Sequence, residues 1–221
     1  MAKVSGPTLR PGGLRITQRA LDFCALPQGA KVVDVGCGPG QTLKLLISLG
    51  FEAWGLDIDP GYLAMAAKFG PTVQGRLESL SLSLQEAEAV FCECVLNLSS
   101  DRLASLAEIF KVLKPGGYFV LGDIFSLEAA GPKSQNTQNQ APSCLAGALS
   151  LKKALSQIEG AGFEVKLIED HGQALKNLAA QLVWAYGQAG LAFLPYPRAS
   201  CAPGAKTPKL TYALVVSQKA L

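Results

Sequence analysis

The stretch Lys31–Gly40, KVVDVGCGPG, decides the fold. Its first five residues are rich in β-branched side chains, which is typical of a buried strand. Glycines then stand at alternate positions, at Gly36, Gly38 and Gly40. Glycine allows a tight turn and lets a ligand approach the backbone with no Cβ in the way. Because ligands of open parallel sheets bind beyond the carboxyl ends of the strands, we expect a ligand-binding loop at 36–40.

The glycine spacing indicates what kind of ligand this loop holds. A dinucleotide-binding loop has the pattern Gly-x-Gly-x-x-Gly, which brings a pyrophosphate to a helix N-terminus. Here the sixth position is Gln41, and the third glycine comes one residue earlier. The loop therefore favours a ligand without a phosphate, and it opposes a nicotinamide-dependent oxidoreductase.

The sequence GLDID at 55–59 supplies the second part of the expected site. It ends a second strand-like run, and Asp57 follows the loop by about twenty residues, as adenosine binding requires. A carboxylate at this position can accept hydrogen bonds from two ribose hydroxyls. The neighbouring Ile58 can pack on the adenine face. The alternative is that Asp57 only caps a turn.

Strand-like and helix-like patterns alternate along the chain. Strands are expected at 31–35, 51–57, 72–74, 89–94, 118–123, 163–169 and 212–217, helices at 10–21, 41–49, 60–68, 101–113, 151–160 and 173–186, and a turn at KPGG, 114–117. This alternation implies an α/β fold with a mostly parallel sheet covered on both faces. Residues 131–143, GPKSQNTQNQAPS, are polar and aperiodic, so a mobile loop is expected there.

Length and composition favour one domain spanning 1–221. The chain has 221 residues, of which 49% are hydrophobic, and this is enough for one core. The net charge of +3, without a dense Lys/Arg stripe, does not favour a nucleic acid partner. No apolar run reaches the ~20 residues of a membrane-spanning helix and no secretion signal is visible, so a cytoplasmic protein with no membrane partner is expected. Monomer and homodimer both remain open.

The cysteine and histidine content bears on the chemistry. The chain has six cysteines and no CxxC pair, so no metal site is expected. In a cytoplasmic chain these cysteines are expected to be thiols. The single histidine, His171, is either a general base near the mouth of the site or a hydrogen-bonding residue at a helix start.

Together, VVDVGCGPG, GLDID and LKPGGYFVLGD resemble the class I S-adenosylmethionine-dependent methyltransferases, over residues 31–123. The resemblance implies S-adenosylmethionine as the cofactor and a Rossmann-like three-layer α/β/α sandwich, whose seven-stranded sheet has an antiparallel last strand. By position, Asp34 and the loop that contains Cys37 would face the methionine part of the cofactor, and Asp57 would hold the ribose. The N-terminal segment 1–27 would be a lid over the cofactor or a plain docking helix.

The resemblance also places GRLESLSL, 75–82, along the adenine. The family often has an aspartate where this chain has Arg76, and arginine cannot accept the hydrogen bond that the adenine amino group donates. The backbone amide of Leu77 remains as a partner for the adenine.

The methyl acceptor is expected beside FCECVLNLSSDR, 91–102, where the chain leaves the fourth strand at the mouth of the site. Glu93 can face the cofactor there, and Cys94 can face the acceptor. With SCLAGALS, 143–150, this segment resembles the arsenite methyltransferases, which have cysteines in CVINL-like and C-x-x-G-A-L-like segments. Cys94 and Cys144 match these positions, which implies a catalytic role. Soft thiolates suit trivalent arsenic and would aim its lone pair at the methyl group.

The chain also departs from the arsenite family. That family usually has a further cysteine near the N-terminus, which Cys24 matches only loosely, and an extra C-terminal domain, for which 221 residues leave no room. LRPGGLRITQRAL, 9–21, and EDHGQALKNLAAQL, 169–182, resemble anaerobe methyltransferases found with radical-enzyme and selenoprotein genes. We expect methyl transfer to a small acceptor. It is either thiophilic, as an arsenite-like metalloid or a sulfur or selenium centre is, or a quinone- or metabolite-type organic molecule. A cofactor-binding protein without activity is the remaining alternative.

Overall fold

The computed structural model describes residues 8, 10–81, 84–128, 147–187 and 209–220. Seven strands in this part of the chain form one sheet. They are β1 (Lys31–Val35), β2 (Glu52–Asp57), β3 (Thr72–Gln74), β4 (Ala87–Glu93), β5 (Leu113–Ser126), β6 (Phe163–Asp170) and β7 (Leu210–Lys219).

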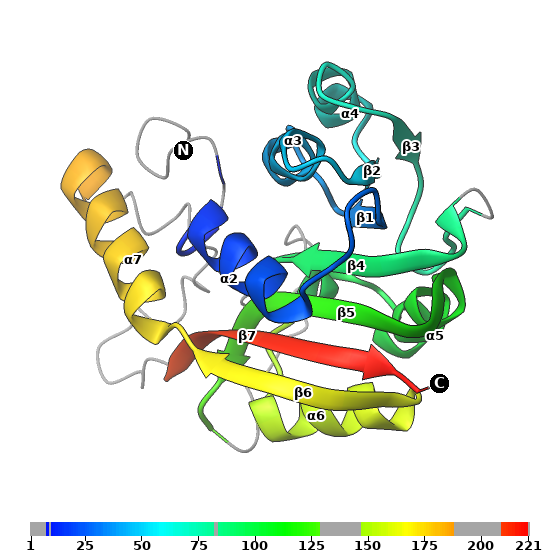
Figure 1. The fold of residues 1–221 in the computed structure, drawn as a ribbon. Coiled ribbons are helices and arrows are strands. Elements are labelled where there is room, and N and C mark those ends of the chain that lie inside the picture. The colour runs from blue at the N-terminus through cyan, green and yellow to red at the C-terminus, as the bar shows by residue number, and fades with distance from the viewer. Residues whose placement is uncertain (1–7, 9, 82–83, 129–146, 188–208, 221) are drawn as a thin grey trace.

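The strand order is β3-β2-β1-β4-β5-β7-β6, as Figure 1 shows. The pairs β1–β2, β1–β4, β2–β3 and β4–β5 are parallel. β7 runs antiparallel to both of its neighbours, β5 and β6. The expected α/β class, the mostly parallel seven-stranded sheet and its antiparallel last strand are therefore confirmed. The chain order reverses at β1 and β4, and such a switch point leaves a crevice at the carboxyl ends of the strands.

Helices cover both faces of the sheet (Figure 1). On one face lie α2 (Leu14–Cys24), α3 (Gln41–Ser48), α4 (Pro60–Ala66) and α7 (Gly172–Tyr186), and on the other lie α5 (Arg102–Val112) and α6 (Leu151–Gly160). A short 3-10 helix, η2 (Leu96–Leu98), follows β4. Each face has its own buried apolar cluster, so the sheet is the middle layer of three.

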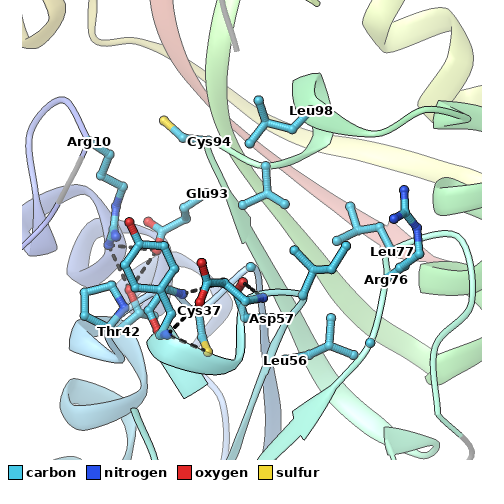
Figure 2. Close-up of a pocket in the computed structure, with 18 of the residues that line it drawn as sticks. Arg10, Cys37, Thr42, Leu56, Asp57, Arg76, Leu77, Glu93, Cys94 and Leu98 are labelled. Atoms are coloured by element: carbon cyan, nitrogen blue, oxygen red, sulfur yellow. Dashed lines mark hydrogen bonds and ion pairs between the residues drawn. The ribbon is translucent and has the colours of Figure 1, made fainter. Parts of the chain in front are cut away.

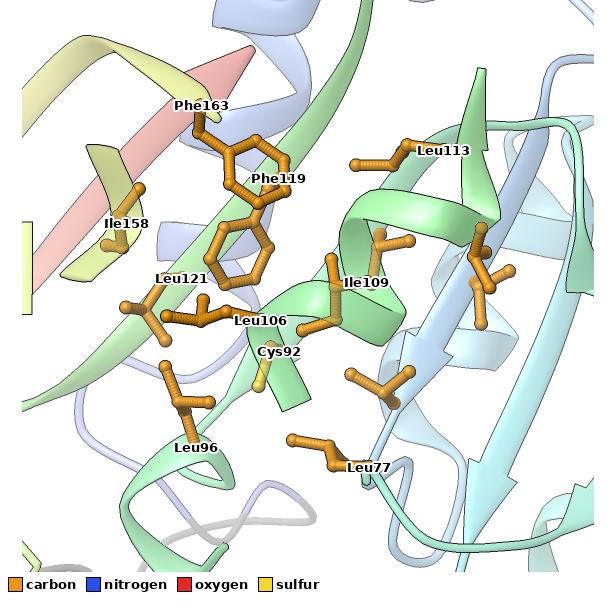
Figure 3. Packing of buried hydrophobic residues seen from close by; sticks show 14 of the residues in the cluster. Leu77, Cys92, Leu96, Leu106, Ile109, Leu113, Phe119, Leu121, Ile158 and Phe163 are labelled. Atoms are coloured by element: carbon orange, nitrogen blue, oxygen red, sulfur yellow. The ribbon is translucent and has the colours of Figure 1, made fainter. Parts of the chain in front are cut away.

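The cluster beneath α5 and α6 fixes β4 and β5 against the helices (Figure 3). Leu106 and Ile109 of α5 are fully buried and point at the sheet, where Phe119 of β5 lies. The Phe119 ring packs 5.3 Å from that of Phe163, between centroids. Burying one such side chain contributes about 1.5–3 kcal/mol to folding. This packing holds the carboxyl end of β4, where the expected acceptor segment begins.

Three local expectations were wrong. KPGG at 114–117 is not a free turn but lies inside β5, as a bulge where the pairing jumps from Ala87↔Leu113 to Ala89↔Tyr118. The first described helix begins at Leu14, not at residue 10, because the two preceding glycines have φ of 72° and 56°. The fourth strand ends one residue before Cys94, whose φ of 60° leaves the extended region.

Other expectations fall outside the described residues. These are the mobile loop at 131–143 and the first seven residues of the 1–27 segment. The single-domain boundaries and the lid stay predictions. Within the described ranges, no helix is both long and apolar enough to cross a membrane.

Candidate functional site

A cavity of about 540 Å³ opens at the carboxyl ends of β1, β2 and β4 (Figure 2). Its volume suits a small-molecule ligand. The lining residues come from five stretches of the chain, namely 8 and 10, 36–39 with 41–42, 56–59 with 62, 75–78, and 93–95 with 98–99. The glycine loop, the acid of β2 and the segment after β4 therefore meet at one cavity.

Two glycines of the loop have different neighbours. Gly36 has a φ of 70°, and a Cβ there would lie 2.2 Å from the Val95 side chain. Residue 36 must therefore stay bare for the β1 loop to touch the segment after β4. Gly38 has a φ of 52°, and a Cβ there would meet nothing within 4 Å. Because Gly38 lines the cavity, its bare backbone faces space that a ligand can fill.

Asp57, at the end of β2, has a carboxylate that the backbone orients. Its Oδ2 accepts a hydrogen bond from the Gly38 amide at 2.8 Å, and its Oδ1 accepts one from the Asp59 amide at 2.9 Å. The side chain is 9% exposed and lines the cavity. Each carboxylate oxygen keeps a second lone pair. Asp57 thus stabilises a local turn and also offers two further acceptor positions to a ligand.

Cys37 and Gly40 pack the loop against the rest of the domain. Cys37 lines the cavity, but its sulfur packs beside Gly55 in the core. Burial raises the pKa of the Cys37 thiol, with Asp34 adding to the effect, so this cysteine is unreactive. Gly40 caps α3 and is not among the residues that line the cavity. A Cβ there would lie 2.7 Å from the Ala66 backbone, so Gly40 allows α3 and α4 to approach.

Asp34 lies in β1, two residues before the loop, and is 3% exposed. Asp34 does not line the cavity, but the charged residues Glu93, Asp57 and Arg10 do, and their charges act on Asp34. Burial, together with the charges of Glu93 and Asp57, raises the pKa of Asp34 to about 8, against the opposing effects of Arg10 and the Leu43 amide. Its Oδ2 has no hydrogen-bond partner in the described part of the chain. Asp34 is thus a protonated acid beneath the loop at neutral pH.

Leu77 and Arg76 line the end of the cavity opposite Arg10 in Figure 2, and Ile58 also lines the cavity. Ile58 is 55% exposed and Leu77 is buried, so the cavity offers apolar side chains to a flat ring. The Arg76 side chain is 57% exposed, and its Nε lies 3.5 Å from a Glu78 oxygen.

Glu78 also lines this end, and the sequence reasoning missed it. Its Oε1 accepts hydrogen bonds from the Ser99 hydroxyl and from the hydroxyl and amide of Ser100. Partial burial opposes ionisation, but these hydrogen bonds outweigh it and lower the pKa of Glu78 to about 2. Glu78 stands two residues after Arg76 and brings the acceptor capacity that Arg76 lacks. The only signal was an acid inside GRLESLSL.

Glu93, the last residue of β4, lines the cavity and is held by three side chains. Its Oε1 accepts a hydrogen bond from the Thr17 hydroxyl at 2.8 Å, and its Oε2 accepts one from the Thr42 hydroxyl at 3.0 Å. Arg10 Nη2 lies 2.8 Å from Oε2 and also donates to both threonines. This network joins the segment before α2 to α2, α3 and β4. Arg10 and Thr8 line the cavity, whereas α2 itself does not.

Cys94 follows β4 and also lines the cavity. Its φ of 60° is in the left-handed region, which costs a non-glycine residue on the order of 1–3 kcal/mol. A hydrogen bond from its amide to the Gly122 carbonyl, at 2.7 Å, holds this conformation. Figure 2 shows the Cys94 sulfur directed to the side of the cavity on which Arg10 lies.

Cys144 lies outside the described residues, but the chain just after it is placed. Gly147 packs on Asn97, since a Cβ there would lie 1.9 Å from the Asn97 carbonyl oxygen. Arg102 donates to the Gly147 carbonyl at 2.6 Å, and Asn97 Nδ2 donates to Asp123 at 2.8 Å. Three residues after Cys144, the chain therefore touches the segment that follows Cys94.

Cys24 and His171 lie away from the cavity lining. Cys24 is 4% exposed within the core cluster, and burial raises the pKa of its thiol to about 12. It cannot supply a third thiolate. None of the four described cysteines forms a disulfide. His171 stands at the start of α7, as the helix-start alternative expects, but its side chain makes no capping hydrogen bond and its Nε2 lies 3.4 Å from a Glu169 oxygen.

Comparison with known families adds to this geometry. Residues 33–121, which run from β1 to β5, match the methyltransferase domain family. These residues and the relatives below support a class I S-adenosylmethionine-dependent methyltransferase domain. The matched range contains the glycine loop, Asp57, Glu93 and Cys94.

The relatives of this methyltransferase domain differ in what they act on. An uncharacterised methyltransferase of Bacillus subtilis, YodH, is 35% identical over 136 residues, 58% of this chain and 57% of the relative. An arsenite methyltransferase of Aquipseudomonas alcaligenes is 28% identical over 174 residues, 70% of this chain and 50% of the relative. The chain thus spans about half the length of these relatives. It shares its fold with phosphoethanolamine N-methyltransferase 2 of Haemonchus contortus, in complex with S-adenosyl-L-methionine, at a TM-score of 0.77, 15% identity and coverage of 100% of this chain and 56% of that one.

The cavity of the methyltransferase domain fits S-adenosylmethionine. Asp57 offers two acceptor positions for the ribose hydroxyls, and Gly38 leaves bare backbone beside it. Ile58 and Leu77 suit the adenine ring. The buried acid Asp34 and the donors around Glu93 lie at the other end, where the charged methionine part would sit.

The raised pKa of Asp34 predicts that S-adenosylmethionine binding releases a proton. At about pH 7 the ligand-free domain keeps Asp34 protonated, because its pKa is about 8. The sulfonium and ammonium charges of the ligand favour the carboxylate and so lower this pKa. Calorimetry in buffers of different ionisation enthalpy should show a release approaching one proton, smaller for the uncharged-sulfur product. Asp34→Asn should abolish the release, and an unchanged release in this variant would rule out Asp34 as its source.

Proposed function

We propose that the protein transfers a methyl group from S-adenosylmethionine to a small thiophilic acceptor, a metalloid or a sulfur or selenium centre held by Cys94 and Cys144. One observation carries the proposal. Cys94 lies in a left-handed backbone conformation at the cavity wall, directly after Glu93. Strained residues of this kind cluster at functional sites. The strain places a soft sulfur at the mouth of the cofactor cavity.

The position of Gly147 supports the pairing with Cys144. Gly147 touches Asn97, three residues after Cys94, and it follows Cys144 by three residues. Three residues of extended chain span at most about 10 Å, so Gly147 limits how far Cys144 can lie from Asn97. Arsenite methyltransferases among the relatives agree with this acceptor class.

Methyl transfer from a sulfonium needs little general acid–base catalysis. S-adenosylmethionine supplies a methyl group already activated by the sulfonium. The acceptor lone pair forms the new bond to carbon while the carbon–sulfur bond breaks, and its electron pair stays on the sulfur as a thioether. The protein has to hold the acceptor in line, and orientation of this kind can supply roughly 7–11 kcal/mol of a barrier. Thiolates at residues 94 and 144 would do so for a soft atom.

A second candidate is methyl transfer to a small organic molecule. The wall beyond Cys94 is apolar, since Val95 and Leu98 line the cavity there. An apolar wall suits a ring or chain better than a small inorganic acid. A ubiquinone biosynthesis O-methyltransferase of Xanthomonas axonopodis is 31% identical over 47% of this chain. In this alternative Cys94 and Cys144 are packing residues.

Cysteine substitution separates the two candidates. We expect Cys94→Ser and Cys144→Ser to lower turnover of arsenite, or of selenite in the presence of thiol, by at least about 100-fold, since loss of even an outer-shell partner of a bound metal costs ~10–100-fold. Mass spectrometry of the methylated products and of S-adenosylhomocysteine gives the rates.

Cys24→Ala is the matched control, because Cys24 is buried away from the cavity, and it should keep the native rate. Equal activity of Cys94→Ser with the thiophilic acceptors would overturn the proposal. Turnover of a quinol or phenol that both serine variants retain would establish the organic acceptor. Binding of S-adenosylmethionine with no turnover of any acceptor would favour the inactive cofactor-binding protein.

A further inference from the structure

Tyr212 of β7 carries a buried hydroxyl that folding alone does not explain. Its side chain is 0% exposed, and its oxygen has no hydrogen-bond partner among the described residues. The ring lies in the apolar cluster on the α2 and α7 face of the sheet. A phenylalanine would fill the same space without leaving a buried polar group unsatisfied. The hydroxyl therefore needs another explanation.

The hydroxyl lies close to Gly122, which pairs with the last residue of β4. A Cβ at Gly122 would be 2.6 Å from the Tyr212 oxygen and 3.8 Å from Glu93 Cγ. Gly122 pairs with Glu93 in the sheet, and its carbonyl accepts the hydrogen bond from the Cys94 amide. Cys94 itself packs against the cluster that contains Tyr212. One bare glycine thus brings the phenol next to the end of β4.

The charges of four nearby groups act on Tyr212, and one of these groups can become a new acceptor for its proton. The four groups are Cys94, Glu93, Arg10 and Asp123. Arg10 has no acceptor atom. Both oxygens of Glu93 are already oriented by Thr17, Thr42 or Arg10, and both oxygens of Asp123 by Asn97, and neither carboxylate accepts from Tyr212. A thiolate at residue 94 is a strong acceptor that appears only when the thiol ionises.

We propose that the Tyr212 hydroxyl is a positioning group that donates a hydrogen bond to the Cys94 thiolate and holds the sulfur towards the methyl acceptor. The inference rests on the proposed function, in which Cys94 binds a thiophilic acceptor. Burial raises the pKa of Tyr212 well above its usual range, and the negative groups Cys94 and Glu93 add to this, so the phenol stays a donor. The thiol proton leaves to solvent, and the hydrogen bond then stabilises the anion.

The test is the apparent pKa of the Cys94 thiol in the ligand-free protein. It is measured from the pH dependence of iodoacetamide alkylation, followed on the Cys94 peptide by mass spectrometry. Tyr212→Phe should raise this pKa by about one pH unit, since a hydrogen bond to a charged group is lost. Tyr118→Phe is the matched control, because Tyr118 lies at the other end of β5, and it should leave the Cys94 pKa unchanged.

Thermal stability distinguishes a positioning role of Tyr212 from a purely structural role. Tyr212→Phe should melt at or above the native temperature and bind S-adenosylhomocysteine with native affinity. A lower melting temperature with an unchanged Cys94 pKa would make Tyr212 structural and overturn the inference. Protein labelled with 3-fluorotyrosine gives an independent measurement, since the more acidic phenol should lower the Cys94 pKa. An unchanged value would also overturn it.

The outcome is separable from that of the proposed function. The thiol titration uses no methyl donor and no acceptor. A shifted Cys94 pKa without turnover of arsenite or selenite would retain the Tyr212–Cys94 pair and reject the thiophilic substrate. Turnover that depends on Cys94, with no shift of the Cys94 pKa in Tyr212→Phe, would retain the thiophilic substrate and reject the Tyr212–Cys94 pair.

Discussion

Replacing Asp57 with asparagine should weaken S-adenosylhomocysteine binding by about 100-fold, because charge-assisted hydrogen bonds to two ribose hydroxyls are lost or weakened. The native carboxylate accepts from Gly38 and Asp59 amides on its two oxygens. An asparagine amide must turn an N–H group towards one of these donors. The variant therefore loses both the ligand contact and part of the loop geometry. Isothermal titration calorimetry gives the affinities.

A ligand without the 2′-hydroxyl tests the assignment of Asp57 to the ribose. Loss of this hydroxyl should cost native protein at least about tenfold in affinity and Asp57→Asn far less, since neighbouring groups couple in a double-mutant cycle. Asp101→Asn is the control, because Asp101 caps α5 and does not line the cavity. It should leave the affinity unchanged, and stability nearly so, because asparagine caps a helix about as well as aspartate. Affinity of Asp57→Asn within threefold of native would contradict the assignment.

The sequence predicted the parts of the site that depend on neighbours in the chain. The strand at 31–35, the bare loop and the acid at the end of the next strand are each encoded within a few residues. Parallel strands then bring their carboxyl ends to one edge, so alternation of strands and helices sufficed to place the cavity. Gly36, Gly38, Asp57, Glu93 and Cys94 all line it.

The parts that were missed depend on contacts between distant segments. Arg10 lies 32 residues from Thr42, which it contacts, and no local pattern marks it as a partner of a buried acid. Tyr212 resembles any aromatic residue of a buried strand until Gly122 is placed beside it. The sequence predicts a turn at KPGG, because proline and glycine are typical both of turns and of β-bulges. The register of β5 against β4 decides between them.

Replacing Arg10 with methionine should destabilise the protein by about 3–5 kcal/mol, since it leaves a buried carboxylate without its cation. The side chains of Arg10 and Glu93 are 11% and 4% exposed. Thr17 and Thr42 can still donate to Glu93, but they carry no charge to offset its desolvation. Guanidinium denaturation followed by circular dichroism measures the change. Lys111→Met removes the exposed partner of Glu108 and should cost at most about 1 kcal/mol.

The double variant Arg10→Met/Glu93→Gln should recover most of the lost stability, because it buries neither charge unpaired. A cost below about 1 kcal/mol for Arg10→Met, or no recovery in the double variant, would show that this network does not hold the N-terminal segment on the cavity.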